Sequence, residues 1–482
     1  MVPAVRRLFI ASCVTWFAGC QCVSVPEREY ACESSADCLT GEACVSQRCV
    51  APRVDGGFDA GLDAGSVDAG GVDAGHDAGG FDAGAGDAGA DAGWSMCNAW
   101  ACVTASWPER SDAGTGAAVA FGPIPADLDG GEFGWFGGVL LPDGRVLAIP
   151  NSSTRFLTFD PRTLEVAPFG APLDVPEPPT GQRWPRSYAG GVLHPNGLVY
   201  VFPYQARAIL EVNPADGGWR EVGRNLLRAD GGAPHYVGGV VDAYGTVWSA
   251  SESSEESVSI VRYDPQSQSS ALFGPSNVSK PRWGGWWGMA RLPDDSLLAF
   301  PKEYGNGPSY LSPYILSIKP AAALDDAQFS EVGGFDLGKP DAGFAVQGGS
   351  LTYEGAVCAT PAAMDSRFVC IVSNGSGTTA TLHEGPVSYW GFNGTFSDGR
   401  VWTAPDSASQ MVSINGNGQA AVRSINATNR YGFLGLVATP QGMVLIPGSP
   451  TQRDFMLVRP GGLQGNDTRP MPVLLSPYFN KL

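Results

Sequence analysis

The sequence is poor in histidine, in basic residues and in long apolar runs. Only four histidines occur among 482 residues (His76, His194, His235 and His383), so metal sites and acid–base pairs built from several histidines are nearly excluded. Lysine and arginine total 30 against 48 aspartates and glutamates, which gives a net charge of −18. A chain with this excess of negative charge repels a phosphate backbone, so we expect no nucleic-acid partner.

The apolar run near the N-terminus is too short to cross a bilayer. The mainly apolar run covers residues 8–18, whereas a transmembrane helix needs about 20 residues. The run follows two arginines and ends in Phe17-Ala18-Gly19-Cys20, so we interpret residues 1–19 as a signal peptide. This ending resembles the lipobox of bacterial lipoproteins. The resemblance implies a lipid on Cys20 and, because Gln21 follows, a place at the outer membrane or cell surface. A periplasmic or secreted protein is the alternative.

Eleven cysteines suit an oxidising compartment. Residues 20–53 are too few to bury a core, so we expect two disulfides with one of three pairings among Cys32, Cys38, Cys44 and Cys49. This spacing resembles the small cysteine-rich knots of bacterial lipoproteins. A zinc site is disfavoured because the segment has neither a CxxC pair nor a histidine. Cys97 and Cys102 can close a short loop, and the partner of Cys22 stays open.

Residues 54–95 form a linker that we expect to be disordered. Within it, residues 54–93 repeat Asp-Ala-Gly and contain 13 glycines and 9 aspartates. The segment offers almost no apolar surface to offset chain entropy. A calcium-binding array is the alternative, but the aspartates lack the ligand spacing of a calcium loop. We therefore expect a spacer, and no metal or other cofactor.

From residue 113 to residue 482 the chain repeats one pattern seven times. Each repeat has a turn dipeptide between two short apolar runs: Asp143-Gly144, Asn196-Gly197, Tyr244-Gly245, Asp294-Asp295, Glu354-Gly355, Asp398-Gly399 and Gln441-Gly442. Asn-Gly and Asp-Gly supply the positive φ of type I′ hairpins. Proline ends the second run in six repeats and Ser251 replaces it in the third. A period of about 50 residues predicts an all-β, seven-bladed β-propeller, with a β-sandwich as the alternative.

Two further features predict long-range pairing. Residues 118–123 match the outer-strand segments of the repeats but precede the first blade, so we expect them to complete blade seven. The tail 473–479 is the competing candidate. Cys358 and Cys370 fall on the second and third strands of blade five, with Met364 midway between them. A hairpin folded there sets the two cysteines opposite each other, and we expect a disulfide.

The repeat resembles propellers of the NHL, gluconolactonase and streptogramin-lyase families, through turns such as 142–145 (PDGR) and strand ends such as Tyr263-Asp264-Pro265. The layout of knot, spacer and propeller is similar to large families of bacterial lipoproteins. In gluconolactonase-like enzymes the resemblance implies metal-binding carboxylates on the inner strands, and in streptogramin lyases histidines and a glutamate at the channel mouth. The inner strands here are apolar and glycine-rich, as in 137–141 and 190–193, so we expect no catalytic residues.

One position, nine residues before the second turn residue, is aromatic in six repeats: Trp135, Tyr188, Tyr236, Trp286, Trp390 and Phe433. The innermost strand begins there, so we expect a ring around one mouth of the central channel. The segments just upstream carry basic residues, and one histidine lies near the same mouth: Arg183, Arg186, Lys280, Arg282, Arg430 and His235. The aromatics either wedge between blades or, with the arginines, bind a glycan or acidic peptide. We expect partly exposed rings at Trp286 and Trp390, a buried Phe433, and Arg186 at the mouth.

These patterns favour a non-catalytic, envelope-anchored propeller that acts as a binding or interaction module for a glycan, peptide or protein. A propeller hydrolase or lyase with an unrecognised site is the first alternative. A purely structural envelope protein is the second.

The lipid anchor predicts a change in fractionation. Acyl chains contribute about 0.8 kcal/mol per buried CH₂ group, so a multiply acylated N-terminus anchors stably. Cys20→Ala is expected to release the protein from membranes, while Cys22→Ala leaves it bound, as measured by membrane fractionation and immunoblotting. A wild-type protein found wholly in the soluble fraction contradicts the anchor.

Overall fold

The computed structural model describes part of the chain, which divides into two compact units, Met1–Ala83 and Gly84–Leu482. The described residues are 43–45, 48–50, 102–105, 118–128, 134–174, 187–223, 226, 235–251, 260–273, 285–301, 314–322, 326–332, 346–352, 354–361, 367–374, 377–385, 390–395, 399–405, 410–424, 432–439, 441–448, 453–459 and 471–474. The signal peptide, the linker and most of the cysteine-rich segment, with Cys20, Cys22, Cys32, Cys38 and Cys97, lie outside these ranges.

In the first unit, strands β1 (Ala43–Val45) and β2 (Arg48–Val50) pair as an antiparallel hairpin. The register places Cys44 opposite Cys49. Cross-strand neighbours lie close enough for a disulfide, and a Cys44–Cys49 bond belongs to one of the three pairings that the sequence leaves open.

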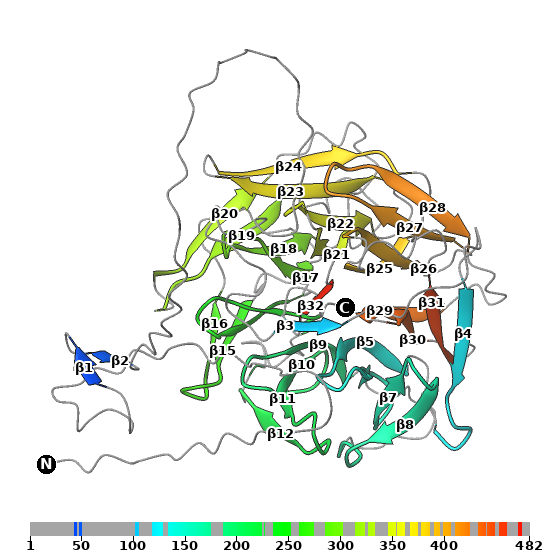
Figure 1. Ribbon diagram of the computed structural model, residues 1–482. Helices are drawn as coiled ribbons and strands as arrows, with labels where there is room; N and C mark the ends of the chain where they lie inside the picture. The colour runs from blue at the N-terminus through cyan, green and yellow to red at the C-terminus, as the bar shows by residue number, and fades with distance from the viewer. Residues whose placement is uncertain are drawn as a thin grey trace, which may run out of the picture. The chain divides into compact units, whose positions relative to one another are not determined.

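The described part of the second unit contains seven four-stranded antiparallel sheets, the blades of a propeller (Figure 1). The first, innermost strands are β5 (Trp135–Leu140), β9 (Tyr188–Leu193), β13 (Val240–Val241), β17 (Trp286–Arg291), β21 (Val346–Leu351), β25 (Trp390–Thr395) and β29 (Phe433–Thr439). The second strands are β6 (Val146–Pro150), β10 (Val199–Pro203), β14 (Val247–Ala250), β18 (Leu297–Pro301), β22 (Val357–Pro361), β26 (Val401–Pro405) and β30 (Gly442–Pro447).

The outer half of each blade follows the same order. The third strands are β7 (Phe156–Asp160), β11 (Ile209–Val212), β15 (Ile260–Asp264), β19 (Ile315–Lys319), β23 (Phe368–Asn374), β27 (Gln410–Ile414) and β31 (Asp454–Arg459). The fourth strands are β8 (Glu165–Phe169), β12 (Trp219–Val222), β16 (Ser269–Phe273), β20 (Gln328–Val332), β24 (Gly377–His383), β28 (Ala420–Ser424) and β4 (Ala118–Pro123). The predicted all-β, seven-bladed propeller is confirmed. Among the described residues, no helix has the length and apolar character needed to span a membrane.

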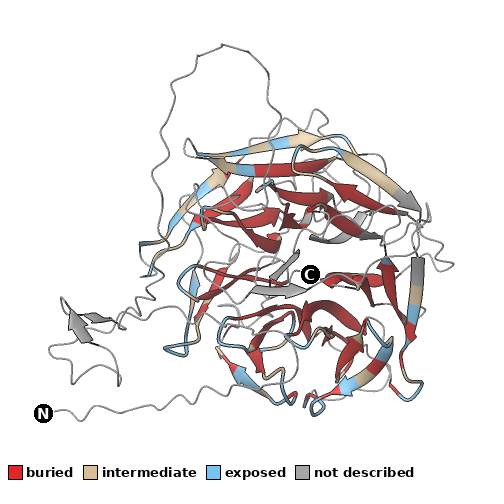
Figure 2. Ribbon diagram, in the orientation of Figure 1, coloured by how far each residue is buried: buried red, intermediate tan, exposed pale blue. Residues whose placement is uncertain are grey.

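Burial falls from the inner strands to the outer ones (Figure 2). Every residue of β6 is buried, whereas only two of the five residues of β8 are buried. Inner strands pack against neighbouring blades on both faces, and this explains why their sequences are continuous apolar runs, as in a buried strand of a layered sheet. Burying one such side chain, for example Ile149, contributes about 1.5–3 kcal/mol.

The antiparallel order assigns the connections to two faces of the propeller. Turns from first to second strand, and from third to fourth, lie on what we call the hairpin face. Connections from second to third strand, and from one blade to the next, lie on the opposite side, the loop face. Hairpin-face turns are short, as in 141–145, whereas loop-face connections extend to 170–187 and 223–239.

The turn between first and second strands is not the type I′ turn expected from the sequence. In blade one the Gly144 N–H donates to the Leu141 carbonyl at 3.0 Å, so Pro142 and Asp143 are the central residues. Only the residue after them has positive φ, as in a type I turn followed by a left-handed residue. The φ of this residue is positive in all seven blades: Gly144, Gly197, Gly245, Asp295, Gly355, Gly399 and Gly442.

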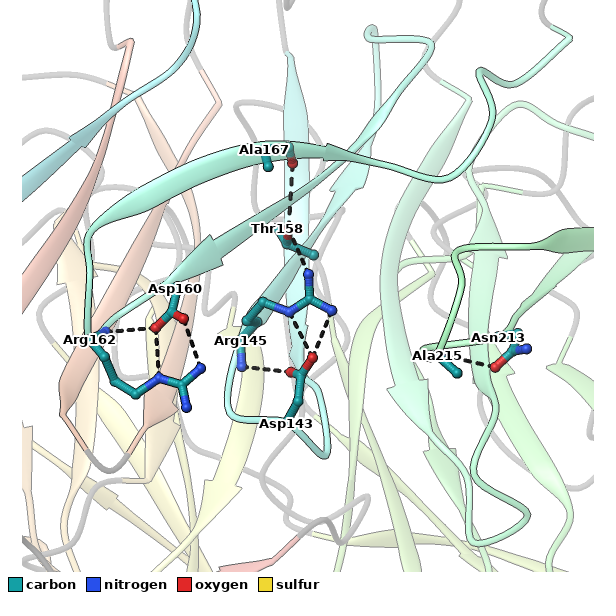
Figure 3. A network of polar contacts seen from close by, with 8 residues as sticks. All are labelled: Asp143, Arg145, Thr158, Asp160, Arg162, Ala167, Asn213 and Ala215. Atoms are coloured by element: carbon teal, nitrogen blue, oxygen red, sulfur yellow. Dashed lines mark hydrogen bonds and ion pairs between the residues drawn. The ribbon is translucent and has the colours of Figure 1, made fainter.

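Side chains of Asp and Asn explain why the turn sequences repeat. Asp143 Oδ1 accepts the N–H of Arg145 two residues on, at 3.0 Å, and Asp160 and Asn213 accept in the same way from Arg162 and Ala215 (Figure 3). These contacts are Asx-turns, in which the side chain takes the place of a backbone acceptor. Both the turn dipeptides and the Asp-Pro strand ends of the sequence are therefore hydrogen-bonded turns of the hairpin face.

Both long-range predictions are confirmed. Strand β4 pairs with β31 along its whole length, from Ala118 opposite Arg459 to Pro123 opposite Asp454. The competing tail forms β32 (Met471–Leu474), which pairs with β3 (Cys102–Ala105) instead. In blade five Cys358 and Cys370 face each other and form a disulfide with the Cα atoms 4.1 Å apart. A closed loop of this length stabilises by about 3 kcal/mol in the chain-entropy estimate.

Blade four offers a test of the turn chemistry, because its left-handed residue is Asp295 (φ 68°) instead of glycine. The left-handed conformation costs an L-residue about 1 kcal/mol. Asp295 offsets this cost because its Oδ1 accepts from Nε of Arg291 at 2.9 Å, and the Arg291 side chain is only 3% exposed. We expect Asp295→Gly to lower the free energy of unfolding by about 1–2 kcal/mol, since losing a charged hydrogen bond outweighs the relief of strain.

Gly197→Asp is the matched control. It introduces the same left-handed aspartate where an added Cβ has no neighbour within 4 Å, and it is expected to cost about 1 kcal/mol. Urea denaturation of both variants measures the two effects. If Asp295→Gly is more stable than wild type, the contact with Arg291 does not offset the free-energy cost of the left-handed conformation at Asp295.

Candidate functional site

At the loop face, each first strand begins with a residue paired to the end of the second strand. Six of these residues face the closing proline and the seventh bridges to a serine: Trp135↔Pro150, Tyr188↔Pro203, Trp286↔Pro301, Val346↔Pro361, Trp390↔Pro405, Phe433↔Pro447 and Tyr236↔Ser251. In the six proline-closed blades the register then shifts, which marks a β-bulge. The glycine two positions on has φ of 63–75° in five blades: Gly137, Gly190, Gly238, Gly288 and Gly348.

The aromatic residues of this ring are buried wherever the structure describes their side chains. Their exposed fractions are between 0% and 5%: Trp135, Tyr188, Tyr236, Trp286 and Phe433. The expectation of a partly exposed ring is wrong for Trp286, which is 2% exposed, because the ring packs within the core between blades; Phe433 is buried as expected. The side chain of Trp390 lies outside the described residues. The burial favours the interpretation of these aromatics as wedges between blades.

A different set of side chains fills the propeller axis. Phe136 of blade one and Trp287 of blade four contact each other edge to face, with ring centroids 6.2 Å apart. Blades one and four are not neighbours in the ring of first strands, so this contact crosses the axis. Both residues belong to one apolar cluster with Ala189, Val237 and Leu434. We call these five residues the axis cluster.

Every member of the axis cluster directly follows the residue paired at the strand start. Successive residues of a strand point to opposite sides, so the wedge and the axis side chain are neighbours in sequence. Phe136 is 8% exposed, while Trp287 and Leu434 are partly exposed. The repeat pattern of the sequence does not mark these residues, because the axis positions differ in type from repeat to repeat. The alternation of strand side chains was the signal that pointed to them.

Backbone hydrogen bonds join the loop-face rims of blades one to three. The Asn151 N–H donates to the Gly134 carbonyl at 2.9 Å, and the Asn151 carbonyl accepts from Ser187 of blade two at 2.7 Å. The Ser187 carbonyl accepts from Tyr204 at 2.9 Å, and the Tyr204 carbonyl accepts from His235 before blade three at 2.8 Å. This chain of bonds holds the strand starts of adjacent blades in a fixed relation around the axis cluster.

The structure does not bring the described histidines together. His235 lies at the loop face, stacked on Tyr204 with centroids 4.9 Å apart. His194 occupies a hairpin-face turn of blade two, and His383 ends the outer strand β24. Among the described residues no group of three or more His, Cys, Asp or Glu side chains is placed to hold a metal ion. The basic residues of the predicted mouth, Arg183, Arg186, Lys280, Arg282 and Arg430, lie outside the described residues.

His194 joins blades two and three at the hairpin face. Its Nε2 donates to the Gly245 carbonyl of the next blade at 2.8 Å, and its Nδ1 accepts the Asn196 N–H at 3.0 Å. A carbonyl only accepts and an N–H only donates, so this arrangement holds one neutral tautomer. Burial of the ring is the main cause that lowers the pKa of His194, although the Gly245 carbonyl, Asn196 and the carboxylates of Asp242 and Asp264 oppose the shift.

No protein-family model and no curated protein matches the chain. Solved structures match the fold. The virginiamycin B lyase of Staphylococcus aureus is 12% identical with a TM-score of 0.53, over 71% of this chain and 99% of the lyase. A streptogramin B lyase is 13% identical with a TM-score of 0.54, over 72% of this chain and 99% of the other. At this identity the match shows the propeller fold that the sequence resemblance implied, and no activity.

The His194 contact predicts a pH dependence. The folded state favours the neutral ring, so its stabilising effect is complete above the ordinary histidine pKa of 6.5 and is lost as pH falls through the lowered folded pKa. We expect the melting temperature of the wild type to fall between pH 7.5 and 5, and His194→Gln to reduce this slope.

Burial also lowers the pKa of His383, which makes no contact of this kind in the described outer strand. His383→Gln is therefore the matched control and is expected to change the slope less. Equal slopes for wild type and His194→Gln contradict the assignment.

Proposed function

We propose that this protein is a non-catalytic binding module of the cell envelope, anchored through a lipid on Cys20 and held away from the membrane by the linker 54–95. The propeller engages a glycan, peptide or protein at the loop-face end of its axis. Cys20 and the linker lie outside the described residues, so this part of the proposal rests on the sequence.

The observation that carries the proposal is the axis cluster. Trp287 keeps part of its ring exposed at the centre of the loop face, where it contacts Phe136 across the axis. A partly exposed aromatic side chain that packing holds in place is a rigid contact for a ligand, because little entropy is lost on binding. The rim hydrogen bonds from Gly134 to His235 fix the strands that present it.

The loop-face connections support the same location. They are the longest of the propeller, and their sequences contain the basic residues Arg183, Arg186, Lys280, Arg282 and Arg430 in a chain of net charge −18. Loops held by a rigid scaffold are the usual place for ligand contacts. Guanidinium groups suit carboxylates, sulfates or phosphates of an envelope polymer, so we include Arg186, Arg282, Arg430 and His235 in the proposed binding surface.

An enzyme is the second candidate, because the fold is similar to that of two lyases. Fold similarity at 12–13% identity does not carry an activity. The described histidines His194, His235 and His383 occupy the hairpin face, the loop face and an outer strand. Acid–base catalysis needs its groups within hydrogen-bond reach of one substrate, and this arrangement favours binding over histidine-based catalysis.

A pair of variants on opposite faces tests the location. Trp287→Leu keeps an apolar side chain beside Phe136 but removes the aromatic face, and we expect it to weaken ligand binding about tenfold. Tyr244→Leu changes a 58% exposed ring on the hairpin face, and we expect no effect. Binding of the full chain to envelope polysaccharide and peptide panels is measured by biolayer interferometry, with melting temperatures as the folding control. Weaker binding by Tyr244→Leu alone places the ligand on the hairpin face and contradicts the proposal.

A further inference from the structure

The chain enters and leaves the propeller at one place. Strand β31 is the third strand of blade seven, so it ends at the hairpin face, and Ala118 of β4 lies opposite its last residue, Arg459. The segment that precedes β4 and the segment that follows β31 therefore leave the propeller from one residue pair. Any force that the N-terminal segment transmits to the propeller reaches it at Ala118.

The two ends of β4 are held differently. At the loop face, the Ile124 N–H donates to the Arg453 carbonyl at 2.9 Å, and the Arg453 guanidinium donates to the Leu128 carbonyl at 2.9 Å. At the hairpin face, the Arg459 Nε donates at 3.0 Å to the Gln441 carbonyl, which belongs to a turn of the same sheet. The first two contacts join the loop-face end of β4 to β31 beyond the strand pairing, whereas the contact of Arg459 holds β31 alone.

A second pairing joins the same two segments outside the blades. Strands β3 and β32, which we call the clasp, pair from Cys102 opposite Leu474 to Ala105 opposite Met471. Ala105 leads to β4, and Met471 is reached from β31, so both connections to the propeller enter the clasp at the same end. The N-terminal segment enters β3 at the other end, at Cys102.

The two connections between the clasp and blade seven have nearly the same length. Residues 106–117 join β3 to β4 and number twelve, and residues 460–470 join β31 to β32 and number eleven. Each spans at most about 40 Å. Two connections of similar length that are joined at both ends become taut at a similar extension. A pull on the clasp is therefore divided between Ala118 and Arg459.

We propose, on the basis of the proposed lipid anchor, that the clasp protects the closing strand of the propeller from tension on its tether. Tension arises when the anchored protein holds a partner at the loop face. Without the clasp, the tension acts on Ala118 alone and draws β4 away from β31. With the clasp, it acts on both strands of the closing pair, so the force that separates them is reduced.

The register of the clasp fits this role. Tension enters β3 at Cys102 and is resisted by β32 at Met471, and these two residues lie at opposite ends of the pairing. The four residue pairs are then loaded in shear and carry the tension together, instead of opening one after another. This loading matters because a two-stranded sheet has little stability of its own.

Constant-force magnetic tweezers test the proposal on the full chain. One handle takes the place of the lipid at residue 20, and the other is attached through an azide-bearing residue in place of Val372, which is 38% exposed on β23 of blade five. The lifetime before β4 separates from β31 is measured. Val473→Pro removes a backbone donor from the clasp, and we expect it to shorten this lifetime about tenfold, the effect of losing one hydrogen bond. Its melting temperature without force is expected to equal that of wild type.

Three further variants serve as controls. Val473→Thr keeps a β-branched residue in the strand, so it is the matched control and is expected to keep the wild-type lifetime. Val103→Cys combined with Val473→Cys places two cysteines opposite each other, and a disulfide is expected to lock the clasp and prolong the lifetime. Val103→Cys alone is expected to behave as wild type.

Two outcomes overturn the inference. Equal lifetimes for wild type and Val473→Pro show that the clasp carries no load. A lower melting temperature for Val473→Pro shows that the clasp stabilises the resting fold instead of acting under tension. The handle replaces the lipid, so the anchor is tested separately: a Cys20→Ala protein that stays membrane-bound, with a shortened lifetime for Val473→Pro, overturns the lipid as the source of tension and supports load sharing by the clasp.

Discussion

The β-bulge at the start of the first strand is the constraint on which the rest of the propeller depends. The first residue of the first strand pairs with the end of the second strand, as Trp135 does with Pro150, and the bulge lies between this residue and the rest of the first strand. The bulge bends the strand where seven blades crowd around one axis. Because it sets the direction of the residues around it, the ring of Trp135 packs between blades while Phe136 meets Trp287 across the axis.

The two faces of the propeller differ in their connections. On the hairpin face, short turns are closed by Asx hydrogen bonds, and His194 ties one blade to the next through Gly245. These contacts fix the turns of the hairpin face. On the loop face, the rim is fixed by backbone bonds from Gly134 to His235, but the connections above it are long. Ligand contacts are commonly made by loops that a rigid scaffold holds, and fixed strand starts below long connections are such an arrangement.

The sequence alone predicts the repeat, the closing strand 118–123 and the Cys358–Cys370 disulfide, because each depends on a local pattern that recurs or on simple hairpin geometry. It does not predict the axis cluster. Residues between blades meet the same surroundings seven times, so their aromatic type repeats. The axis residues Phe136, Ala189, Val237, Trp287 and Leu434 converge on one asymmetric cluster, where large and small side chains must combine to fill the space. Each axis residue is the next residue along the chain from a residue packed between blades, and a shift of one residue moves a strand side chain to the opposite side. The axis residues share no residue type from repeat to repeat, so the sequence does not distinguish them.

Sharing blade seven between the two ends of the chain also sets the order of folding. Strand β4 is synthesised before every blade, but its partner β31 comes last, and the Arg453 guanidinium donates to the Leu128 carbonyl across 325 positions of sequence. Contacts of such high sequence separation form slowly, because the loop must close before they stabilise anything. Blade five, by contrast, gains a covalent link between residues only 12 apart. Local blades therefore form first, and the ring closes only once β31 is available to pair with β4.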